Sequence, residues 1–572
     1  MKTFVTLAVL FLAGASFYIE TFPVFPSAQL VVSLIDILII VAAFSEFLFS
    51  LSKAKYKRIY FTHNLIASIL LLLYIILFIA DKILFYYSSM TVFSGIAAIM
   101  IIRNMLILFK VFTRFQKFSS FLQSIAVNPA QTIVESFLIV IAAGTVFLAM
   151  PFASEGKGSL SILDSLFTAT SAVCVTGLIV VDTATYFSIW GKIIIMLLIQ
   201  IGGLGIMILS FSTVFMFRKT VSLENRLLIS YMVNEDDMTK ISSMVKNIVA
   251  LTLLIEAAGA LILFFSFPGR TSLGDRIFYS MFHAVSAFCN AGFALFSDSL
   301  EQFSSTPSIV LTVAFLIILG GISFSVMTDI GSSIYSRVRS FITGIYRKNA
   351  ISTNSRVVLT YTIFLIFSGM LLVYFFEHGN AMKNDNLALQ YLSAFFQSVT
   401  LRTAGFNSIS FSALMPATVF IMIIYMFAGG ASGSTAGGIK INTIAVILSY
   451  FKSFLRKENA ITLYNREIGL QTTLKAFSIL SLGITAVITG FLVLLITEKA
   501  MPLDLLFETV SAFATVGLST GVTSSLSAAG KIVIIMLMFI GRLGPLTIVS
   551  SFGSDLRGKP LHRYPEAEIL IG

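Results

Sequence analysis

Four glycines are the residues whose spacing could do chemistry in this chain. They lie 112 to 115 residues apart, and each follows a similar stretch with a phenylalanine ten residues earlier. Backbone carbonyls can replace the hydration shell of a cation, and glycine adopts the dihedrals that point successive carbonyls one way. The repeat therefore predicts a cation path at these positions: Gly177, Gly292, Gly405 and Gly517.

Each glycine and the two residues before it form a candidate site for a monovalent cation. We expect these residues to hold the ion in turn as it passes. The twelve candidate ligating residues are Val175, Thr176, Gly177, Asn290, Ala291, Gly292, Thr403, Ala404, Gly405, Thr515, Val516 and Gly517. The alternative is that the glycines only allow helices to pack closely in a membrane. That alternative explains one glycine more readily than four at matched positions.

The stretch before each glycine is apolar but too short to cross a bilayer. Residues 164–174, for example, would make a helix of ~17 Å. Such a segment can only dip into the membrane and return, which requires its backbone to be buried in protein or to line water. The negative C-terminal end of the helix then faces the cation path. Asp164 and Asp504 are placed to lie at the start of two of these helices.

A glycine-rich segment interrupts the apolar run that follows the third glycine. Residues 428–438 hold five glycines in 11 residues, which cannot form a stable helix. Unwound backbone at membrane depth should line a cavity, so this segment could block or open the path. A passive kink is the alternative. The candidate gating residues in the segment are Gly429, Gly430, Gly433, Gly437 and Gly438.

Three basic residues lie close to the predicted path. Arg542 falls within the last apolar run, where a charge needs a partner or water, so it suits a barrier or a latch on the gating segment. A purely structural pairing is the alternative. Lys440 follows the segment and is either part of the gate or extends to the cytoplasmic face. Arg402 adjoins the third site and is interpreted as an orienting donor or as structural.

The composition places these residues in a membrane protein. The chain has 572 residues, of which 57% are hydrophobic and 11% are charged. Soluble globular proteins have about 25% charged residues. Apolar runs long enough to cross a bilayer recur, which predicts an all-α polytopic membrane protein with twelve spans. These lie near residues 3–20, 29–51, 61–80, 88–109, 132–151, 190–217, 244–266, 307–331, 357–376, 417–449, 472–497 and 531–556.

The charge pattern orients the spans. The net charge of +11 is concentrated in short gaps between apolar runs, which predicts cytoplasmic gaps rather than nucleic-acid binding. With the N-terminus inside, all these basic gaps and the C-terminus fall on the cytoplasmic side. We therefore expect a multi-pass protein of a bacterial inner membrane, in contact with the lipid bilayer.

The repeat also divides the chain. Residues 1–124 are predicted to form about four accessory transmembrane helices. Four membrane–pore–membrane repeats follow around a pseudo-fourfold central pore, at residues 125–240, 241–352, 353–465 and 466–572. The third of these repeats carries the gating segment. It is also predicted to be the only repeat whose second span is broken.

Residues 125–572 resemble the Trk/Ktr/HKT superfamily of potassium transporters, and in particular its bacterial TrkH/KtrB-like membrane subunits. The motifs that carry the resemblance are residues 174–178 (CVTGL), 402–407 (RTAGFN) and 432–440 (SGSTAGGIK). The resemblance implies a homodimer and a cytosolic nucleotide-binding regulatory subunit. It also implies an arginine like Arg542 that helps to set the gate. In plant relatives a serine at the first filter position accompanies sodium selectivity, so Gly177 favours K⁺.

The sequence thus predicts the pore-forming subunit of a potassium uptake system. A Na⁺-selective protein or a Na⁺- or H⁺-coupled K⁺ symporter is the alternative. Coupled carriers often have acids in the middle of the membrane, and Glu256 is the main candidate here. No nucleophile motif, metal-ligand cluster or nucleotide-binding loop indicates an enzyme or an organic cofactor.

Overall fold

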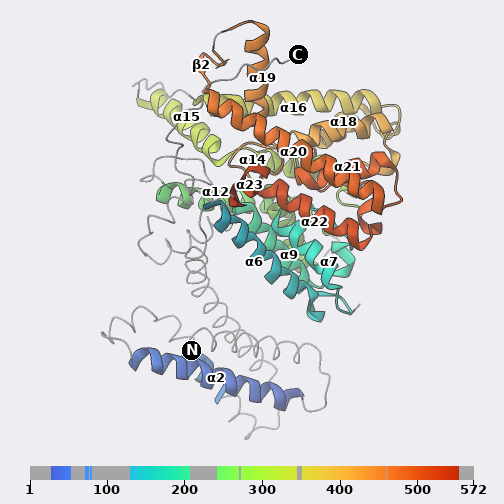
Figure 1. Ribbon diagram of the computed structural model, residues 1–572. Helices are drawn as coiled ribbons and strands as arrows, with labels where there is room; N and C mark the ends of the chain where they lie inside the picture. Colours follow the sequence, from blue (N-terminus) through green and yellow to red (C-terminus); the bar gives the residue numbers. More distant parts are fainter. Residues whose placement is uncertain are drawn as a thin grey trace. The chain divides into compact units, whose positions relative to one another are not determined.

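The structure is a computed structural model that describes residues 28–52, 71–76, 78–79, 129–156, 158–205, 241–268, 272–343, 351–458 and 460–552. The chain divides into two compact units, Met1–Ser124 and Ile125–Gly572, and each is described by itself (Figure 1). The expected spans at 3–20 and 88–109, most of the one at 61–80, and both termini lie outside the described residues.

In the first unit, the described residues form one long helix and a short helical stretch. Helix α2 covers Ala28–Ser52, close to the expected span at 29–51. The Tyr74 hydroxyl donates to the Asp36 carboxylate over 2.8 Å. Both side chains are buried, so the hydrogen bond stabilises a polar pair among apolar residues.

In the second unit, the order long helix, short helix, second helix occurs four times among the described residues. We call these groups triplets one to four. The long helices are α6 (Pro129–Ala149), α12 (Ile241–Ser266), α16 (Thr353–Glu377) and α20 (Leu470–Thr497). Each contains a stretch that is long and apolar enough to cross a membrane. They agree with the expected spans to within a few residues.

The short helices have strong local start signals. They are α7 (Ile162–Val173), α13 (Leu273–Phe288), α17 (Leu387–Thr400) and α21 (Pro502–Ala514). Ser161, Ser272 and Asn386 cap the first three, because each side chain accepts a hydrogen bond from a backbone amide of the first turn. Asp164 and Asp504 lie in first turns as expected, where a negative charge suits the helix dipole.

The second helices are α9 (Ile189–Leu204), α14 (Pro307–Gly321), α18 (Pro416–Phe427) and α22 (Ala528–Leu543). The expectation that only the third one is broken is wrong. Helix α14 meets α15 (Phe324–Thr343) at 103°, and α22 meets α23 (Pro545–Phe552) at 93°. The second bend occurs at Gly544, which has φ +86°, followed by Pro545, which cannot continue a helix. The spans expected at 307–331 and 531–556 are therefore bent pairs.

The span expected at 417–449 is interrupted as predicted. Helix α18 ends at Phe427, and α19 covers Ile441–Leu455. The span expected at 190–217 is described only as far as residue 205, because residues 206–240 lie outside the described part. By length and composition, the described residues include four helices able to cross a membrane, or six if each bent pair counts as one span.

Short elements connect the helices. They are α8 (Thr183–Tyr186), the 3₁₀ turns η1 (Pro151–Ala153), η2 (Glu301–Phe303), η3 (Phe411–Ala413) and η4 (Val522–Ser525), and an antiparallel pair of two-residue strands, β1 (Thr462–Leu463) and β2 (Arg466–Glu467).

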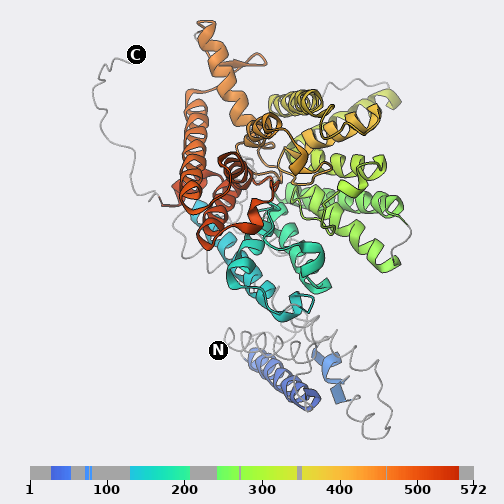
Figure 2. The ribbon, with the colours of Figure 1, turned by 90° about the vertical axis from the view of Figure 1, so that its right-hand side faces the viewer.

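The triplets close into a ring. Within each triplet the long helix packs on the short one, and between triplets α9 packs on α13, α14 on α17, α18 on α21, and α22 on α7. Figure 2 shows this order, with the colours running round the unit from teal through green and yellow to red. The short helices are therefore held side by side around one centre.

Candidate functional site

The four glycines meet at the centre of the ring. A Cβ atom added at any one of them would lie 2.8 to 3.3 Å from the Cα of the next glycine, in the order Gly177, Gly292, Gly405, Gly517 and back to Gly177. It would also collide with the carbonyl oxygen of Ala291, Ala404, Val516 or Thr176, respectively. Segments more than 100 residues apart therefore come together backbone to backbone, and only glycine leaves space between them.

The backbone alternates in the same way in all four segments. Each glycine has a positive φ, between 71° and 93°, and so does the residue two positions before it. The latter residues are Val175, Asn290, Thr403 and Thr515, with φ between 53° and 68°. Left-handed backbone is costly for residues other than glycine, so its recurrence at four matched non-glycine positions indicates a backbone geometry that the surrounding fold imposes.

The serines six residues before three glycines hold the loops from behind. Ser286 and Ser511 donate to the carbonyls of Phe293 and Leu518, over 2.7 and 2.6 Å. Ser171 accepts from the Gly177 amide at 3.0 Å. In triplet three the matched residue is Val399, which has no hydroxyl group.

The glycines line the floor of a cavity of about 380 Å³. Its lining includes three carboxylates and no basic side chain: Asp182, Asp298 and Glu301. Clefts lined by one sign of charge concentrate counter-ions. The sequence alone does not assign these acids to the site, because only the fold brings their loops together at one cavity. We call this cavity the vestibule.

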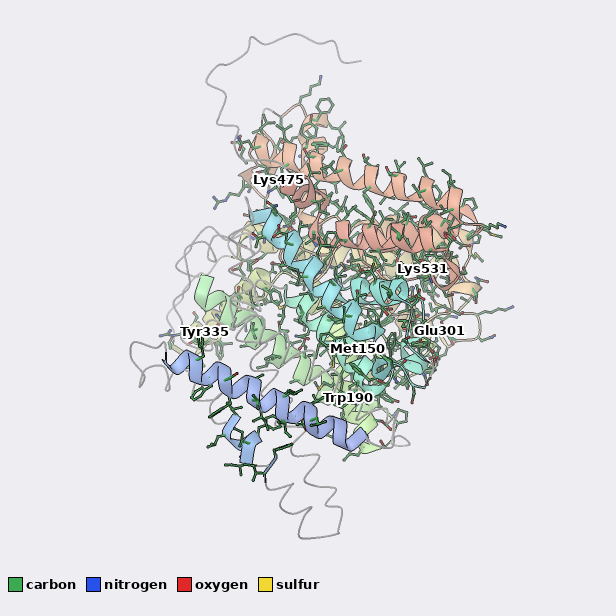
Figure 3. The ribbon with its side chains drawn as sticks, turned by 60° about the horizontal axis from the view of Figure 1, so that its bottom comes forward. Met150, Trp190, Glu301, Tyr335, Lys475 and Lys531 are labelled. Atoms are coloured by element: carbon green, nitrogen blue, oxygen red, sulfur yellow. The ribbon has the colours of Figure 1, made fainter. Side chains whose placement is uncertain are left out.

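Hydrogen bonds between triplets stabilise the vestibule wall. Asn407 donates to Glu301 at 2.6 Å, and Ser297 donates to Asp182 at 2.5 Å. The pKa of Glu301 is raised by burial and by the nearby charge of Asp298, while the hydrogen bond from Asn407 opposes that shift. Glu301 and Lys531 lie at the opposite end of the unit from Lys475 (Figure 3).

The gating segment lies on the side of the glycines away from the vestibule. Its base is closed by the Gly429 amide donating to Ile439 at 2.9 Å and the Ile441 amide donating to Gly430 at 3.0 Å. Gly437 packs against the side chain of Thr515, which is two residues before Gly517. The segment therefore contacts the residues that lead to Gly517.

Thr435 anchors the segment to triplet two. Its hydroxyl lies 2.9 Å from the carbonyl oxygen of Gly320 and 3.2 Å from that of Phe288, and its amide donates to Gly320 at 3.2 Å. Gly320 lies at the bend between α14 and α15. Sequence analysis did not single out Thr435, since nothing in its local sequence distinguishes it from other threonines.

Arg542 joins the segment to triplet one. It is in the last turn of α22, just before the bend to α23, and donates to the carbonyls of Thr435 and Gly202. Together with Thr435, it connects elements of all four triplets at one level. A latch on the segment would require such contacts. The same hydrogen bonds also satisfy the guanidinium group, so both the latch and the purely structural pairing expected from the sequence are compatible with the position of Arg542.

The other two basic residues have different surroundings. The Lys440 ammonium group donates to the carbonyl of Ala436 within the segment, and the side chain is half-buried. Arg402 is buried and donates to the Thr362 hydroxyl at 3.2 Å, so it connects α17 to α16. Arg402 is absent from the vestibule lining, which fits the orienting or structural interpretation.

Two cysteines and a histidine are buried in triplets one and two. Cys174 and Cys289 are free and buried. His283 is buried in α13 and stacks on Phe296. Within the described ranges, no three His, Cys, Asp or Glu side chains could together hold a metal ion.

Comparisons with known proteins identify the family. A family model described as TrkH, cation transport protein, matches residues 97–556. The chain is 38% identical over 447 residues to the Ktr system potassium uptake protein B of Bacillus subtilis, covering 78% of this chain and 97% of that protein. It is 35% identical over 451 residues to the potassium/sodium uptake protein NtpJ of Enterococcus hirae, covering 78% and 97%.

A solved structure has the same fold. The crystal structure of the potassium transporter TrkH from Vibrio parahaemolyticus superposes with a TM-score of 0.60, covering 86% of this chain and 98% of that chain at 17% identity. The helical, apolar architecture described above is thus that of an all-α membrane transporter. The chain belongs to the TrkH family of cation transport proteins, within the Trk/Ktr superfamily.

Proposed function

We propose that this chain is the pore-forming subunit of a potassium uptake system. K⁺ moves through the ring of four glycines, from the vestibule to the cytoplasm. The observation that carries the proposal is the closed ring of glycine backbones with alternating left-handed dihedrals. Such a ring presents carbonyl oxygens in place of water, as cation selectivity requires. The twelve filter residues given above are the proposed ligands.

The gating segment closes the path below the ring in this proposal. It touches the fourth filter strand at Thr515 and is held by Thr435 and Arg542. Lys440 and the five glycines complete the gate, because glycine backbone can rearrange with little steric cost. A charged side chain beside the path also opposes cation passage until it moves away.

The partners are part of the same proposal. We infer a homodimer in a bacterial inner membrane with both termini cytoplasmic. We also infer a cytosolic nucleotide-binding regulatory subunit, since the relatives at 38% and 39% identity are named as parts of a Ktr system. Residues 1–124 are proposed as an accessory transmembrane unit, and the four repeats keep the boundaries expected from the sequence.

The test is flux of Rb⁺ against Na⁺ in liposomes with the purified protein. We expect Rb⁺ to be preferred, and Gly177→Ser to lower the Rb⁺/Na⁺ flux ratio because it adds a side chain at a positive φ inside the ring. Gly379→Ser is the matched control, because a Cβ there meets no atom within 4 Å. Equal Rb⁺ and Na⁺ flux in the unmodified protein would contradict the proposed selectivity.

Coupled symport is the second candidate. Glu256 on α12 is buried at membrane depth, accepts from Gln200 at 3.2 Å, and forms none of the ion pairs found among the described residues. One relative is also named as a potassium/sodium uptake protein. Rb⁺ accumulation driven by an imposed Na⁺ or H⁺ gradient, and lost in Glu256→Gln, would favour this candidate over a passive pore.

A further inference from the structure

The ninth residue before each filter glycine occupies a buried position behind the filter. The four residues are Thr168, His283, Phe396 and Glu508. All four are buried, yet their chemistry differs: a hydroxyl, an imidazole, a phenyl ring and a carboxylate. A carboxylate at this depth requires specific partners, because burying an unpaired charge is expensive.

Glu508 binds the loop that leaves the fourth filter strand. It accepts from the Thr523 hydroxyl at 2.8 Å and from the Ser519 hydroxyl, and the backbone of Thr520 lies beside it. Ser519 and Thr523 also line the vestibule. Among the described residues, the ion pairs include none with Glu508, so these donors are the partners that the structure gives the carboxylate.

His283 binds the corresponding loop in triplet two. The amide of Leu295, three residues after Gly292, donates to Nε2 at 3.3 Å. Thr520 is likewise three residues after Gly517. The His283 Nδ1 group therefore carries the proton and donates to the Tyr279 carbonyl at 2.7 Å. Triplets two and four lie opposite each other in the ring, and in both the serine six residues before the glycine binds the next carbonyl after it.

The matched residues of the other two triplets do not reach their loops. Thr168 donates to the Asp164 carbonyl within its own helix at 2.9 Å. Phe396 has no polar group to offer. At this position, therefore, only the opposite triplets two and four anchor the loop that follows the glycine.

We propose that Glu508 is a positioning residue that sets the ion selectivity of the filter by fixing the outer end of the fourth filter strand. The inference rests on the proposed filter role of the glycines. Without the carboxylate, the Ser519 and Thr523 hydroxyls lose a shared acceptor, and the Gly517 backbone gains freedom. Selectivity depends on the placement of carbonyl oxygens, so it should fall even where the protein remains folded.

The experiment measures the Rb⁺/Na⁺ flux ratio of full-length variants in liposomes. The ratio is independent of how much folded protein is present, so a loss of stability alone would not change it. We expect Glu508→Ala to lower the ratio about tenfold, as for loss of hydrogen bonds to a charged group. Glu508→Gln should give an intermediate ratio, because the amide keeps one acceptor oxygen.

Glu498→Gln is the matched control. This glutamate follows α20, the long helix of the same triplet, and accepts from the Ser527 amide at 3.1 Å, but it is not part of the vestibule lining. Its variant should keep the original ratio. If Glu508→Ala fails to fold, Thr523→Val removes one donor to the same carboxylate at nearly constant volume, and we expect a ratio about two- to threefold lower.

The outcomes separate the two proposals. An unchanged ratio in the Glu508 or Thr523 variant, with a lowered ratio in Gly177→Ser, would overturn the role of Glu508 alone. An unchanged ratio in all of them would remove the filter role of the glycines and this inference with it. A lowered ratio in Glu498→Gln equal to that of Glu508→Gln would also overturn the inference, since a carboxylate outside the vestibule would then have the same effect.

Discussion

Triplets two and three contribute equally to the ring of glycines but hold their filter strands differently. Behind Gly292, Ser286 and His283 both bind the outgoing loop. Behind Gly405 the matched residues are Val399 and Phe396, which cannot form hydrogen bonds through their side chains. The backbone shows the same difference: the Ala291 amide reaches back five residues, whereas the Ala404 amide reaches back four.

The second helices differ as well. In triplet two the bend between α14 and α15 takes two residues, whereas triplet three has 13 residues between α18 and α19. The triplet with the gating segment is thus also the one whose filter strand lacks the serine anchor. Under the proposed function, the backbone ring that would select the cation is similar in all four triplets, whereas the groups that support it and the segments below it differ.

The largest expected effect comes from cutting the contact between the gating segment and triplet one. Arg542→Gln removes the charge that donates to Thr435 and Gly202. Because hydrogen bonds to charged groups contribute about 1.5–3 kcal/mol, we expect Rb⁺ flux in liposomes to rise about tenfold or more. Lys531→Gln, which removes a charge from the other end of the same helix, is the control. Flux that falls in Arg542→Gln would contradict a latch.

A smaller effect should separate the anchored strands from the unanchored one. Ser286→Ala removes a hydrogen bond of 2.7 Å from a filter loop, whereas Val399→Ala removes only apolar contacts at the matched position. A hydrogen bond contributes about 1 kcal/mol, so we expect the Rb⁺/Na⁺ ratio to fall about fivefold in the serine variant. The valine variant should keep its ratio and lose only thermal stability. Equal ratios in the two variants would show that the difference between the triplets has no consequence for selection.

The vestibule predicts a dependence on external pH. The pKa of Glu301 is raised, so its carboxylate takes up a proton at a higher pH than an ordinary glutamate does. The pKa of an ordinary glutamate is about 4.3. We expect Rb⁺ uptake at low salt to fall about two- to threefold as the external pH drops through the raised pKa of Glu301. The vestibule then carries less negative charge and attracts cations less strongly. Glu301→Gln should lower uptake at neutral pH and flatten the profile. A profile that keeps its shape in this variant would assign the pH dependence to another group.

The smallest effect concerns the closure of the ring itself. Lys531 on α22 and Asp164 on α7 form an ion pair of 2.6 Å between triplets four and one, with 17% and 22% of their side chains exposed. Such a pair contributes up to about 1 kcal/mol. Lys531→Met should lower the melting temperature by a few degrees and leave the Rb⁺/Na⁺ ratio unchanged. A change in selectivity would mean that this contact also shapes the filter.

Periodicity predicted much of the fold because a membrane restricts the choices. An apolar run of sufficient length must cross, and a shorter one must be buried in protein or line water, so the long and short helices lie at the residues that the sequence predicted. The breaks were harder to find. The break at residues 428–438 has five glycines and was predicted, whereas the bend after Gly321 has no proline and only two glycines in the preceding turn.

The sequence by itself determined the residue types along the proposed cation path. They are glycine at four matched places, serine six residues before three of them, and a glycine-rich segment that cannot be helical. These follow from local backbone chemistry, which each short stretch carries alone. The tertiary structure decided which distant groups meet. The closure of four triplets into a ring brings the three acids together at the vestibule and brings Thr435 of the gating segment to Gly320 and Arg542. It also places His283 and Glu508 behind opposite glycines. A distance between residues so far apart in the chain is set by packing, which no single stretch of sequence specifies.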